Sequence, residues 1–164
     1  MGRKIKTQSY STIGKIVILN EAARSLIDEN TPIEILADGY DWAEGPVWWD
    51  EKKAILFSDV PQNTIYMWKS GTFGAEPFIK PSGYTGVGVY SDEPGSNGLT
   101  TDGKGNLISC EHGDRRVSIM PLNVPGGKRT ITDNWQGKRF NSPNDVIMAS
   151  NGRIYFTDPP YGLP

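Results

Sequence analysis

Three side chains with oxygen donors recur along the chain at similar intervals. Glu44, Asn97 and Asn144 each precede a short apolar run, and they lie 53 and 47 residues apart. A turn and a second apolar run follow each of them, and the second run ends in an acid, at Asp59, Glu111 and Asp158. Carboxylate and amide oxygens suit calcium or magnesium, with zinc or manganese as further candidates. If the three residues converge, the pattern predicts a divalent metal site, and calcium is the metal we expect.

The segments around these residues are three copies of one unit, at residues 44–68, 97–120 and 144–162. In each unit the second run (AILFS, NLISC or RIYFT) is rich in β-branched and aromatic residues and is bounded by turn formers, which predicts antiparallel hairpins. A repeat of about 50 residues is typical of propeller blades. The polar residue that opens each unit would then begin the innermost strand of a blade, so the three side chains would meet near the ring axis.

We expect two regions in this all-β chain. Residues 1–34 form a lead-in with one short helix over residues 20–30, where four apolar residues share a helical face behind a cap at Asn20. Residues 35–164 form a partial propeller of about three blades. Because propellers close with about four to eight blades, we expect a missing second half, provided by further sequence or by self-association of the chain.

The chain resembles the SMP-30/gluconolactonase/LRE-like family, in particular its bacterial gluconolactonase branch, in four motifs that occur in order: ILADGYDWAEGPVW, LFSDVPQNTIYMW, SNGLTTDGKGNLISCEHGDRRV and SPNDVIMASNGRIYFTDPPYG. Members of that family are six-bladed β-propellers that bind a divalent metal and hydrolyse lactones. The resemblance implies that Glu44 and Asn144 are metal ligands and that Asn97 contacts substrate or a metal-bound water. It also implies a further ligand, an aspartate that acts as general base. We expect that aspartate beyond Pro164, so no catalytic residue is assigned within this chain.

The reaction expected of such a site is hydrolysis of a sugar lactone, a step of carbohydrate metabolism. A bound cation would polarise the lactone carbonyl and acidify a water, and a nearby carboxylate would take a proton as the water attacks the acyl carbon. The ring would open to a hydroxy acid. The chain contains no GxSxG elbow, which disfavours a serine nucleophile. The alternative function is that of a half-propeller that binds or assembles with another chain and has no catalytic activity on its own.

Three further residues are candidates for the site. His112 is the only histidine, which excludes a multi-histidine metal site. It follows the run NLISC, where it either binds substrate, by contact or as a donor to the oxyanion, or packs without a catalytic role. Tyr84 belongs to an expected loop from Lys80 to Pro94 over the channel mouth, where it would bind substrate. Asp145 adjoins Asn144 and would orient it from behind.

Other residues of note have structural interpretations. The three repeated acids are expected to form turn or blade-to-blade hydrogen bonds rather than to act as catalysts. Four tryptophans are expected to fill the core: Trp42, Trp48, Trp49 and Trp68. Cys110 is the only cysteine, so no disulfide can form within the chain.

The composition narrows the kind of partner. The formal net charge is −2, from 17 Lys+Arg against 19 Asp+Glu, and no basic stripe occurs. We therefore expect a small-molecule lactone as ligand, and neither nucleic acid nor a membrane surface. The longest aliphatic run near the start, at residues 16–19, is too short for a signal peptide or a membrane span. The expected location is the cytoplasm, or the periplasm if an export signal has been lost.

Overall fold

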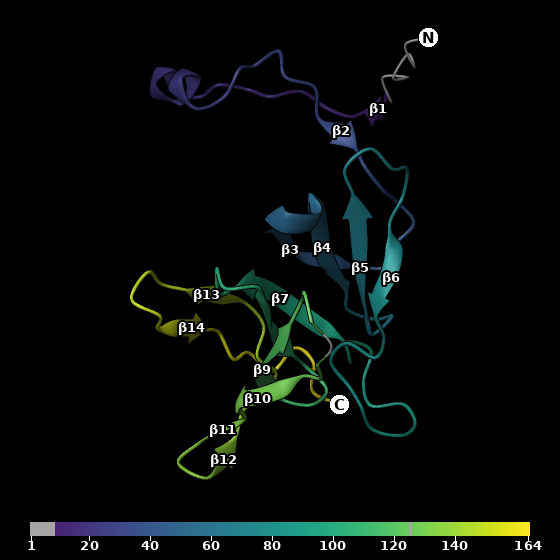
Figure 1. The fold of residues 1–164 in the computed structure, drawn as a ribbon, viewed down its shortest axis with the longest axis vertical. Helices are drawn as coiled ribbons and strands as arrows, with labels where there is room; N and C mark the ends of the chain where they lie inside the picture. Colours follow the sequence, from purple (N-terminus) through teal and green to yellow (C-terminus); the bar gives the residue numbers. More distant parts are fainter. Residues whose placement is uncertain (1–8, 125) are drawn as a thin grey trace.

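The computed structural model describes residues 9–124 and 126–164 and consists almost entirely of antiparallel β-sheets (Figure 1). In the first sheet four strands pair in chain order: β3 (Ala43–Trp49), β4 (Ala54–Asp59), β5 (Thr64–Lys69) and β6 (Glu76–Ile79). The second sheet repeats this order: β7 (Ser96–Thr101), β8 (Asn106–Glu111), β9 (Arg116–Pro121) and β10 (Arg129–Thr132). A hairpin of two strands follows: β13 (Val146–Met148) and β14 (Ile154–Phe156).

The remaining elements are short. Two pairs of two-residue strands lie outside the large sheets: β1 (Ser11–Thr12) with β2 (Glu34–Ile35), and β11 (Asn134–Trp135) with β12 (Lys138–Arg139). Two 3-10 helices complete the described structure: η1 (Glu21–Ser25) and η2 (Asp50–Lys52). In the part of the chain that is described, no helix has the length and apolar character needed to cross a membrane.

The first strands of the three sheets lie next to one another. β3 packs against β7, and β7 packs against β13. Because each later strand pairs with the strand before it, both four-stranded sheets extend outward from this shared edge. Blades around a propeller axis have this arrangement. The expectation of an all-β partial propeller is confirmed: the described residues contain two four-stranded sheets and a two-stranded start of a third.

The core lies between the sheets. One cluster joins the first and second sheets: Trp49, Leu56, Ile65, Leu99 and Leu107. A second cluster joins the second sheet to the β13–β14 hairpin: Ile108, Cys110, Val117 and Val146. Adjacent residues of a strand point to opposite faces, so Leu107 enters the first cluster and Ile108 the second, and both are fully buried. The second sheet is therefore held on both faces, which fixes its innermost strand between the two neighbouring ones.

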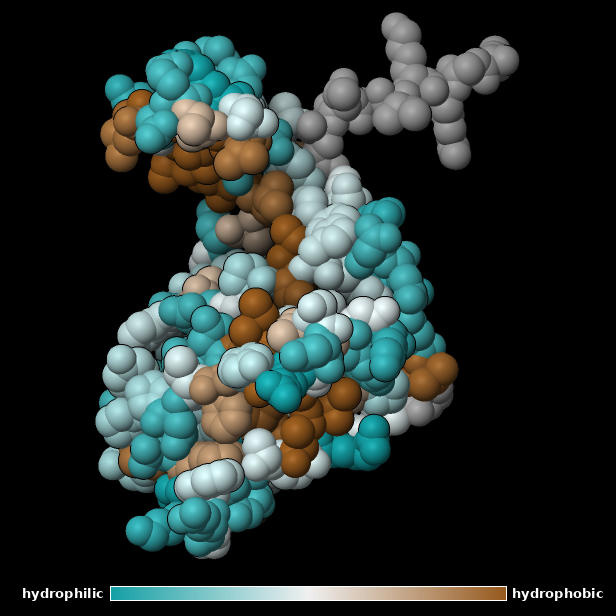
Figure 2. All heavy atoms as spheres, turned by 90° about the vertical axis from the view of Figure 1, so that its left-hand side faces the viewer, coloured by the Kyte–Doolittle hydropathy of each residue, from teal (hydrophilic) through white to brown (hydrophobic). Residues whose placement is uncertain are grey.

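The N-terminal arm differs from its expectation. The helix predicted over residues 20–30 is only the five-residue η1, and its cap is the predicted one, because the Asn20 side chain accepts a hydrogen bond from the N–H of Ala22 at 2.9 Å. Figure 1 shows η1 far from the sheets, and Figure 2 shows that apolar side chains gather on one side of this arm. Leu26 remains 88% exposed. The predicted apolar face has no core to pack on, so a longer helix gains no tertiary stabilisation.

The repeated acids have the expected structural roles. Asp59 accepts hydrogen bonds from the N–H groups of Asp41 and Trp42, and Asp158 accepts one from the N–H of Asn141. Glu111 is fully buried and bonded to three side chains: Arg116, Ser118 and Lys128. Asp59 and Asp158 thus join the end of a second strand to the segment that enters the first strand of the same sheet. Glu111 joins the end of β8 to β9 and to the segment before β10, so these contacts lie within a blade.

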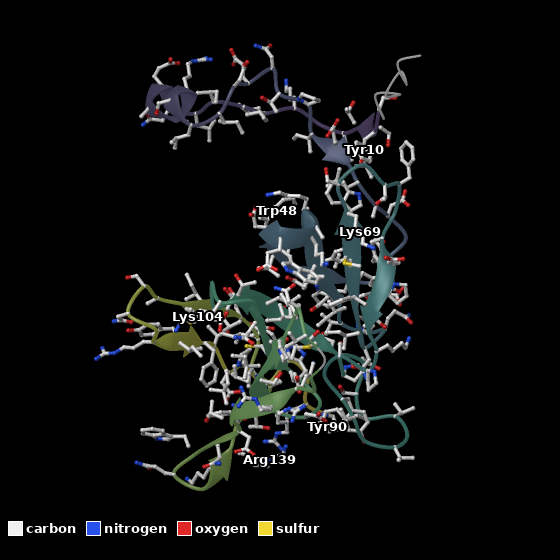
Figure 3. All side chains as sticks on the ribbon, in the orientation of Figure 1. Tyr10, Trp48, Lys69, Tyr90, Lys104 and Arg139 are labelled. Carbon is white, nitrogen blue, oxygen red and sulfur yellow. The ribbon has the colours of Figure 1, made fainter. Side chains whose placement is uncertain are left out.

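The tryptophans divide into two groups. Trp49 and Trp68 are buried, as expected of core residues. The core interpretation is wrong for Trp42 and Trp48, which are 50% and 46% exposed (Figure 3 labels Trp48). Both donate their indole N–H to a carboxylate two residues further on.

Candidate functional site

The three repeated polar residues line one cavity of about 410 Å³. Glu44 lies on β3, Asn97 lies on β7, and Asn144 lies two residues before β13. Three other residues complete the lining: Trp42, Glu93 and Tyr161. The structure thus brings together the residues that the repeat pattern predicts to converge, from three successive sheets.

The innermost strands of the two four-stranded sheets each contain a bulge, at Glu44 and at Asn97. The pairing of β3 with β4 shifts register between Glu44 and Val47, and the pairing of β7 with β8 shifts between Ser96 and Leu99. A bulge re-aims the side chains on either side of it and strengthens the local twist. Because the irregularity falls at the same place in both sheets, it turns Glu44 and Asn97 toward the same cavity.

Glycines allow the three strands to approach closely. A Cβ atom on Gly45 would lie 2.2 Å from the carbonyl oxygen of Asn97, and one on Gly98 would lie 2.7 Å from the carbonyl oxygen of Asn144. The N–H of Gly98 also donates to that Asn144 oxygen, at 2.7 Å. No side chain fits at either position without movement of the backbone, so the glycine after Glu44 and the glycine after Asn97 set the spacing of the site.

Two hydrogen bonds hold side chains of the cavity wall. The indole Nε1–H of Trp42 donates to Oε1 of Glu44 at 3.0 Å. Nε2 of His112 lies 3.1 Å from Oδ1 of Asn144. By contrast, the side-chain amide of Asn97 forms no hydrogen bond with any described residue, although Asn97 is only 8% exposed. An unpaired amide on a cavity wall is available to a ligand.

His112 is fully buried behind the cavity wall. Nδ1 lies 3.2 Å from the carbonyl oxygen of Glu93 and 3.7 Å from its carboxylate. Burial lowers the pKa of His112, and this outweighs the hydrogen bond with Asn144 and the carboxylates of Glu93 and Glu44, which act in the opposite direction. The ring is therefore neutral at neutral pH.

The donors of the cavity fit a hard divalent cation. Glu44 supplies a carboxylate, and Asn97 and Asn144 supply amide oxygens, which is the ligand chemistry that calcium prefers. A second carboxylate, from Glu93, adds negative charge to the same wall. In residues 9–124 and 126–164 no group of three His, Cys, Asp or Glu side chains is placed to hold a metal, so any site here depends on the two amides.

The other candidates lie away from the cavity lining. Tyr84 stacks on Tyr90 at 4.9 Å between ring centroids (Figure 3 labels Tyr90) and lines a separate polar groove. Asp145 is exposed, and its Oδ1 accepts from the N–H of Val146 at 2.8 Å. Among the described residues, His112 rather than Asp145 contacts the Asn144 side chain.

Three lining residues were missed from the sequence. Trp42 precedes Glu44 by two residues, just before β3 begins, and side chains two residues apart in an extended segment share a face, so this spacing was a signal in the sequence. Glu93 comes from the long loop between β6 and β7, and Tyr161 follows β14. Neither of these two occupies a repeated position, so no pattern in the sequence pointed to them.

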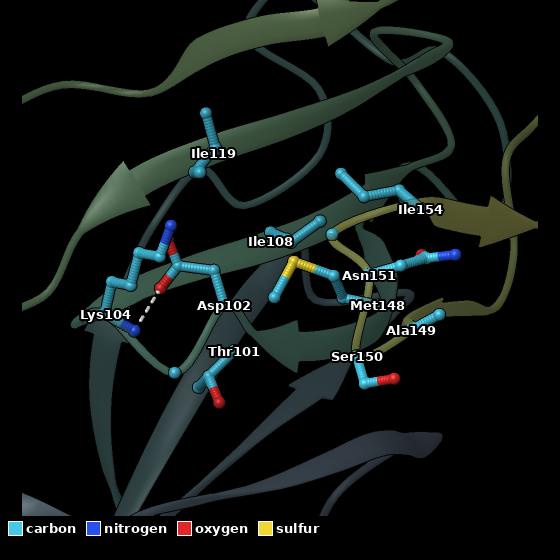
Figure 4. A pocket seen from close by; sticks show the side chains of 12 residues that line it. Thr101, Asp102, Lys104, Ile108, Ile119, Met148, Ala149, Ser150, Asn151 and Ile154 are labelled. Carbon is cyan, nitrogen blue, oxygen red and sulfur yellow. Dashed lines mark hydrogen bonds between the residues drawn. The ribbon is translucent and has the colours of Figure 1, made fainter.

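A larger cavity, of about 670 Å³, lies at the opposite ends of β7 and β13 (Figure 4). Its walls carry apolar side chains: Ile108, Ile119, Met148 and Ile154. The carboxylate of Asp102 at its rim accepts from the N–H groups of Lys104 and Asn106 and so closes a turn. This cavity lacks converging polar groups, and we assign it no chemistry.

Comparison with known proteins identifies the relatives of this chain. The pattern of the SMP-30/Gluconolactonase/LRE-like region matches residues 42–163. A gluconolactonase of Zymomonas mobilis subsp. mobilis is 41% identical over 157 residues, which cover 93% of this chain and 43% of that protein.

Two solved structures are also similar. One, of a putative gluconolactonase, has a TM-score of 0.65 and 38% identity over 77% of this chain and 39% of that one. Another, of a gluconolactonase from Xanthomonas campestris described as important in glucose secondary metabolic pathways, has a TM-score of 0.66 and 30% identity over 79% of this chain and 38% of that one. The chain spans less than half the length of each of these relatives, and it belongs to the SMP-30/gluconolactonase/LRE-like family.

Proposed function

We propose that this chain carries the cation-binding part of a lactone hydrolase that opens a sugar lactone to the hydroxy acid. The observation that carries the proposal is the convergence of Glu44, Asn97 and Asn144 on one cavity from three successive sheets. The likeness to gluconolactonases supports the substrate class. A cavity of about 410 Å³ is within the usual range for small-molecule sites.

Each residue has a distinct part in this proposal. Glu44 and Asn144 would hold the cation, with calcium as the metal, and a bound cation supplies polarisation of the lactone carbonyl and a more acidic water. The Trp42 indole fixes the Glu44 carboxylate through its N–H. Asn97, whose amide is unpaired among the described residues, is available to a hydroxyl of the substrate or to a water. No general base is assigned within this chain.

The experiment measures acid release from a sugar lactone by the full chain, with calcium or with a chelator, above the spontaneous rate. Because no general base is assigned within this chain, calcium-dependent hydrolysis is expected when a further segment or partner chain that supplies the base is present. Glu44→Gln should then lower the rate at least about 100-fold, because the amide removes the charge on the ligand. Glu76→Gln is the matched control, since Glu76 lies exposed on the outer strand β6 and, among the described residues, forms an ion pair with Lys69 alone. Equal rates for the two variants would refute the assignment of Glu44.

A second candidate function is that of an assembly module. The observation that favours it is the apolar cavity beside the β13–β14 hairpin, where the third sheet has two strands and its neighbours have four. A sheet edge and an apolar wall of this kind accept further strands. Sedimentation of the chain at several concentrations tests this: reversible association supports it, and a monomer at all concentrations contradicts it.

A further inference from the structure

His112 is fixed in one orientation by its surroundings. It directly follows β8, and its backbone N–H donates to the carbonyl oxygen of Gly95 at 3.1 Å. Gly162 covers the ring so closely that a Cβ atom there would lie 2.6 Å from Nδ1 of His112. The ring is fully buried and has no room to turn over.

Both ring nitrogens face an oxygen. Nδ1 is 3.2 Å from the Glu93 carbonyl oxygen, and Nε2 is 3.1 Å from Oδ1 of Asn144. A carbonyl oxygen only accepts, so Nδ1 carries a hydrogen. A neutral imidazole has one hydrogen, and Nε2 is then an acceptor that needs a donor. At the same time, no described residue accepts a hydrogen bond from Nδ2 of Asn144.

Rotating the Asn144 side-chain amide by 180° exchanges Oδ1 and Nδ2, which have nearly the same shape and differ only in hydrogen bonding. After this exchange the Nδ2 group donates to Nε2 of His112, so both side chains have a suitable hydrogen-bond partner. We propose that His112 is a positioning residue for Asn144: its Nε2 accepts a hydrogen bond from Nδ2, so that Oδ1 faces away from the ring. Asn144 lines the cavity, and its oxygen is then the end presented there. The cation-binding role of that oxygen rests on the proposed function, whereas the orientation of the amide does not.

The first sheet offers an internal comparison. Asp59 pairs with Thr64 as Glu111 pairs with Arg116, so Val60 occupies in the first sheet the place of His112 in the second. Val60 is buried and lacks a side chain that could orient an amide. No histidine in the first sheet therefore contacts the Asn97 amide as His112 contacts that of Asn144. This agrees with an Asn97 side chain that is available to bind substrate. Of the two site amides, only that of Asn144 would have its oxygen fixed in this way.

The first experiment determines the protonated nitrogen of the ring by ¹⁵N NMR of the metal-free chain at neutral pH. Since the chain has one histidine, the ring signals are unambiguous. The expected result is a hydrogen on Nδ1 and none on Nε2. A hydrogen on Nε2, alone or together with one on Nδ1, would overturn the proposal. Val60→Ala, a buried substitution at the equivalent place, is the control and should leave the tautomer unchanged.

The second experiment measures calcium affinity by calorimetry for His112→Phe in two backgrounds. With Asn144 present, affinity should fall about 10- to 100-fold, the usual effect of losing a group that orients a metal ligand. In an Asn144→Asp background the loss should be much smaller, because the two oxygens of a carboxylate are equivalent. Equal losses in both backgrounds would show a merely structural role for His112. If the chain binds no calcium, the proposed function fails, while the tautomer still decides the orientation of the amide.

Discussion

The N–H of Gly98 donates to the carbonyl oxygen of Asn144 at 2.7 Å, and a Cβ atom on Gly98 would lie at the same distance from that oxygen. The contact joins β7 to the segment that enters β13, and Gly45 makes the corresponding approach to Asn97. Backbone contacts therefore set the distances between the polar residues of the cavity. Side-chain packing between the sheets then stabilises an arrangement that the glycines permit.

Gly98→Ala should lower the free energy of unfolding by about 1–3 kcal/mol, the usual cost of overpacking. Urea denaturation measures this change. Gly127→Ala is the control, because a Cβ atom there meets nothing within 4 Å. If both variants unfold at the same urea concentration, the close approach of the two strands does not exist in solution.

Trp42→Phe should weaken calcium binding by about 10-fold or more, since the Glu44 carboxylate loses the donor that orients it. The chain offers a matched control in Trp48→Phe, because Trp48 donates to Asp50, also two residues further on, outside the cavity lining. Calorimetry compares the two. Equal affinities would mean that the indole of Trp42 does not contribute to the site.

Glu111→Gln should destabilise the chain by about 3–5 kcal/mol, because two cations stay near a buried group that no longer carries a charge. Nζ of Lys128 and Nε of Arg116 lie 2.7 and 2.5 Å from its carboxylate. Burial lowers the pKa of Lys128, and Glu111 opposes that change. The exposed pair of Lys69 and Glu76 is the reference, and Glu76→Gln should cost less than about 1 kcal/mol in the same denaturation experiment.

Cys110 should be unreactive in the folded chain. Burial raises the pKa of its thiol far above the usual 9.0, and nearby carboxylates act in the same direction. As pH rises above about 9 the unfolded chain loses this proton first, so the folded state binds more protons and its stability falls with pH. Cys110→Ala should remove this contribution to the decrease of the unfolding free energy with pH above about 9. A thiol reagent that modifies the native chain at pH 8 as fast as the denatured chain would contradict the burial.

The repeat in the sequence predicted the features that rest on period and strand chemistry. The hairpins, the order of the sheets and the convergence of Glu44, Asn97 and Asn144 all follow from one unit that occurs three times. Each copy places its first polar residue at the same point of an innermost strand, and neighbouring copies pack against each other. Contacts that are repeated in this way can be inferred from one chain alone.

Features outside the repeat could not be found in that way. Glu93 and Tyr161 reach the cavity from a loop and from the segment after β14, and their positions depend on tertiary packing. Tyr84 belongs to the same loop as Glu93, yet it stacks on Tyr90 away from the cavity lining. The arm around η1 has helical periodicity but no sheet to pack on. The periodicity of the sequence therefore predicted a longer helix than the five residues of η1.

The most direct test is calorimetric titration of calcium into the full metal-free chain and into Glu44→Gln. We expect saturable binding of one calcium by the unmodified chain, and affinity at least about 10-fold lower in the variant, because a charged ligand is replaced by a neutral one. Glu76→Gln should bind as the unmodified chain does. Absence of calcium binding, or an unchanged affinity in Glu44→Gln, would contradict the claim that the three sheets form a cation site.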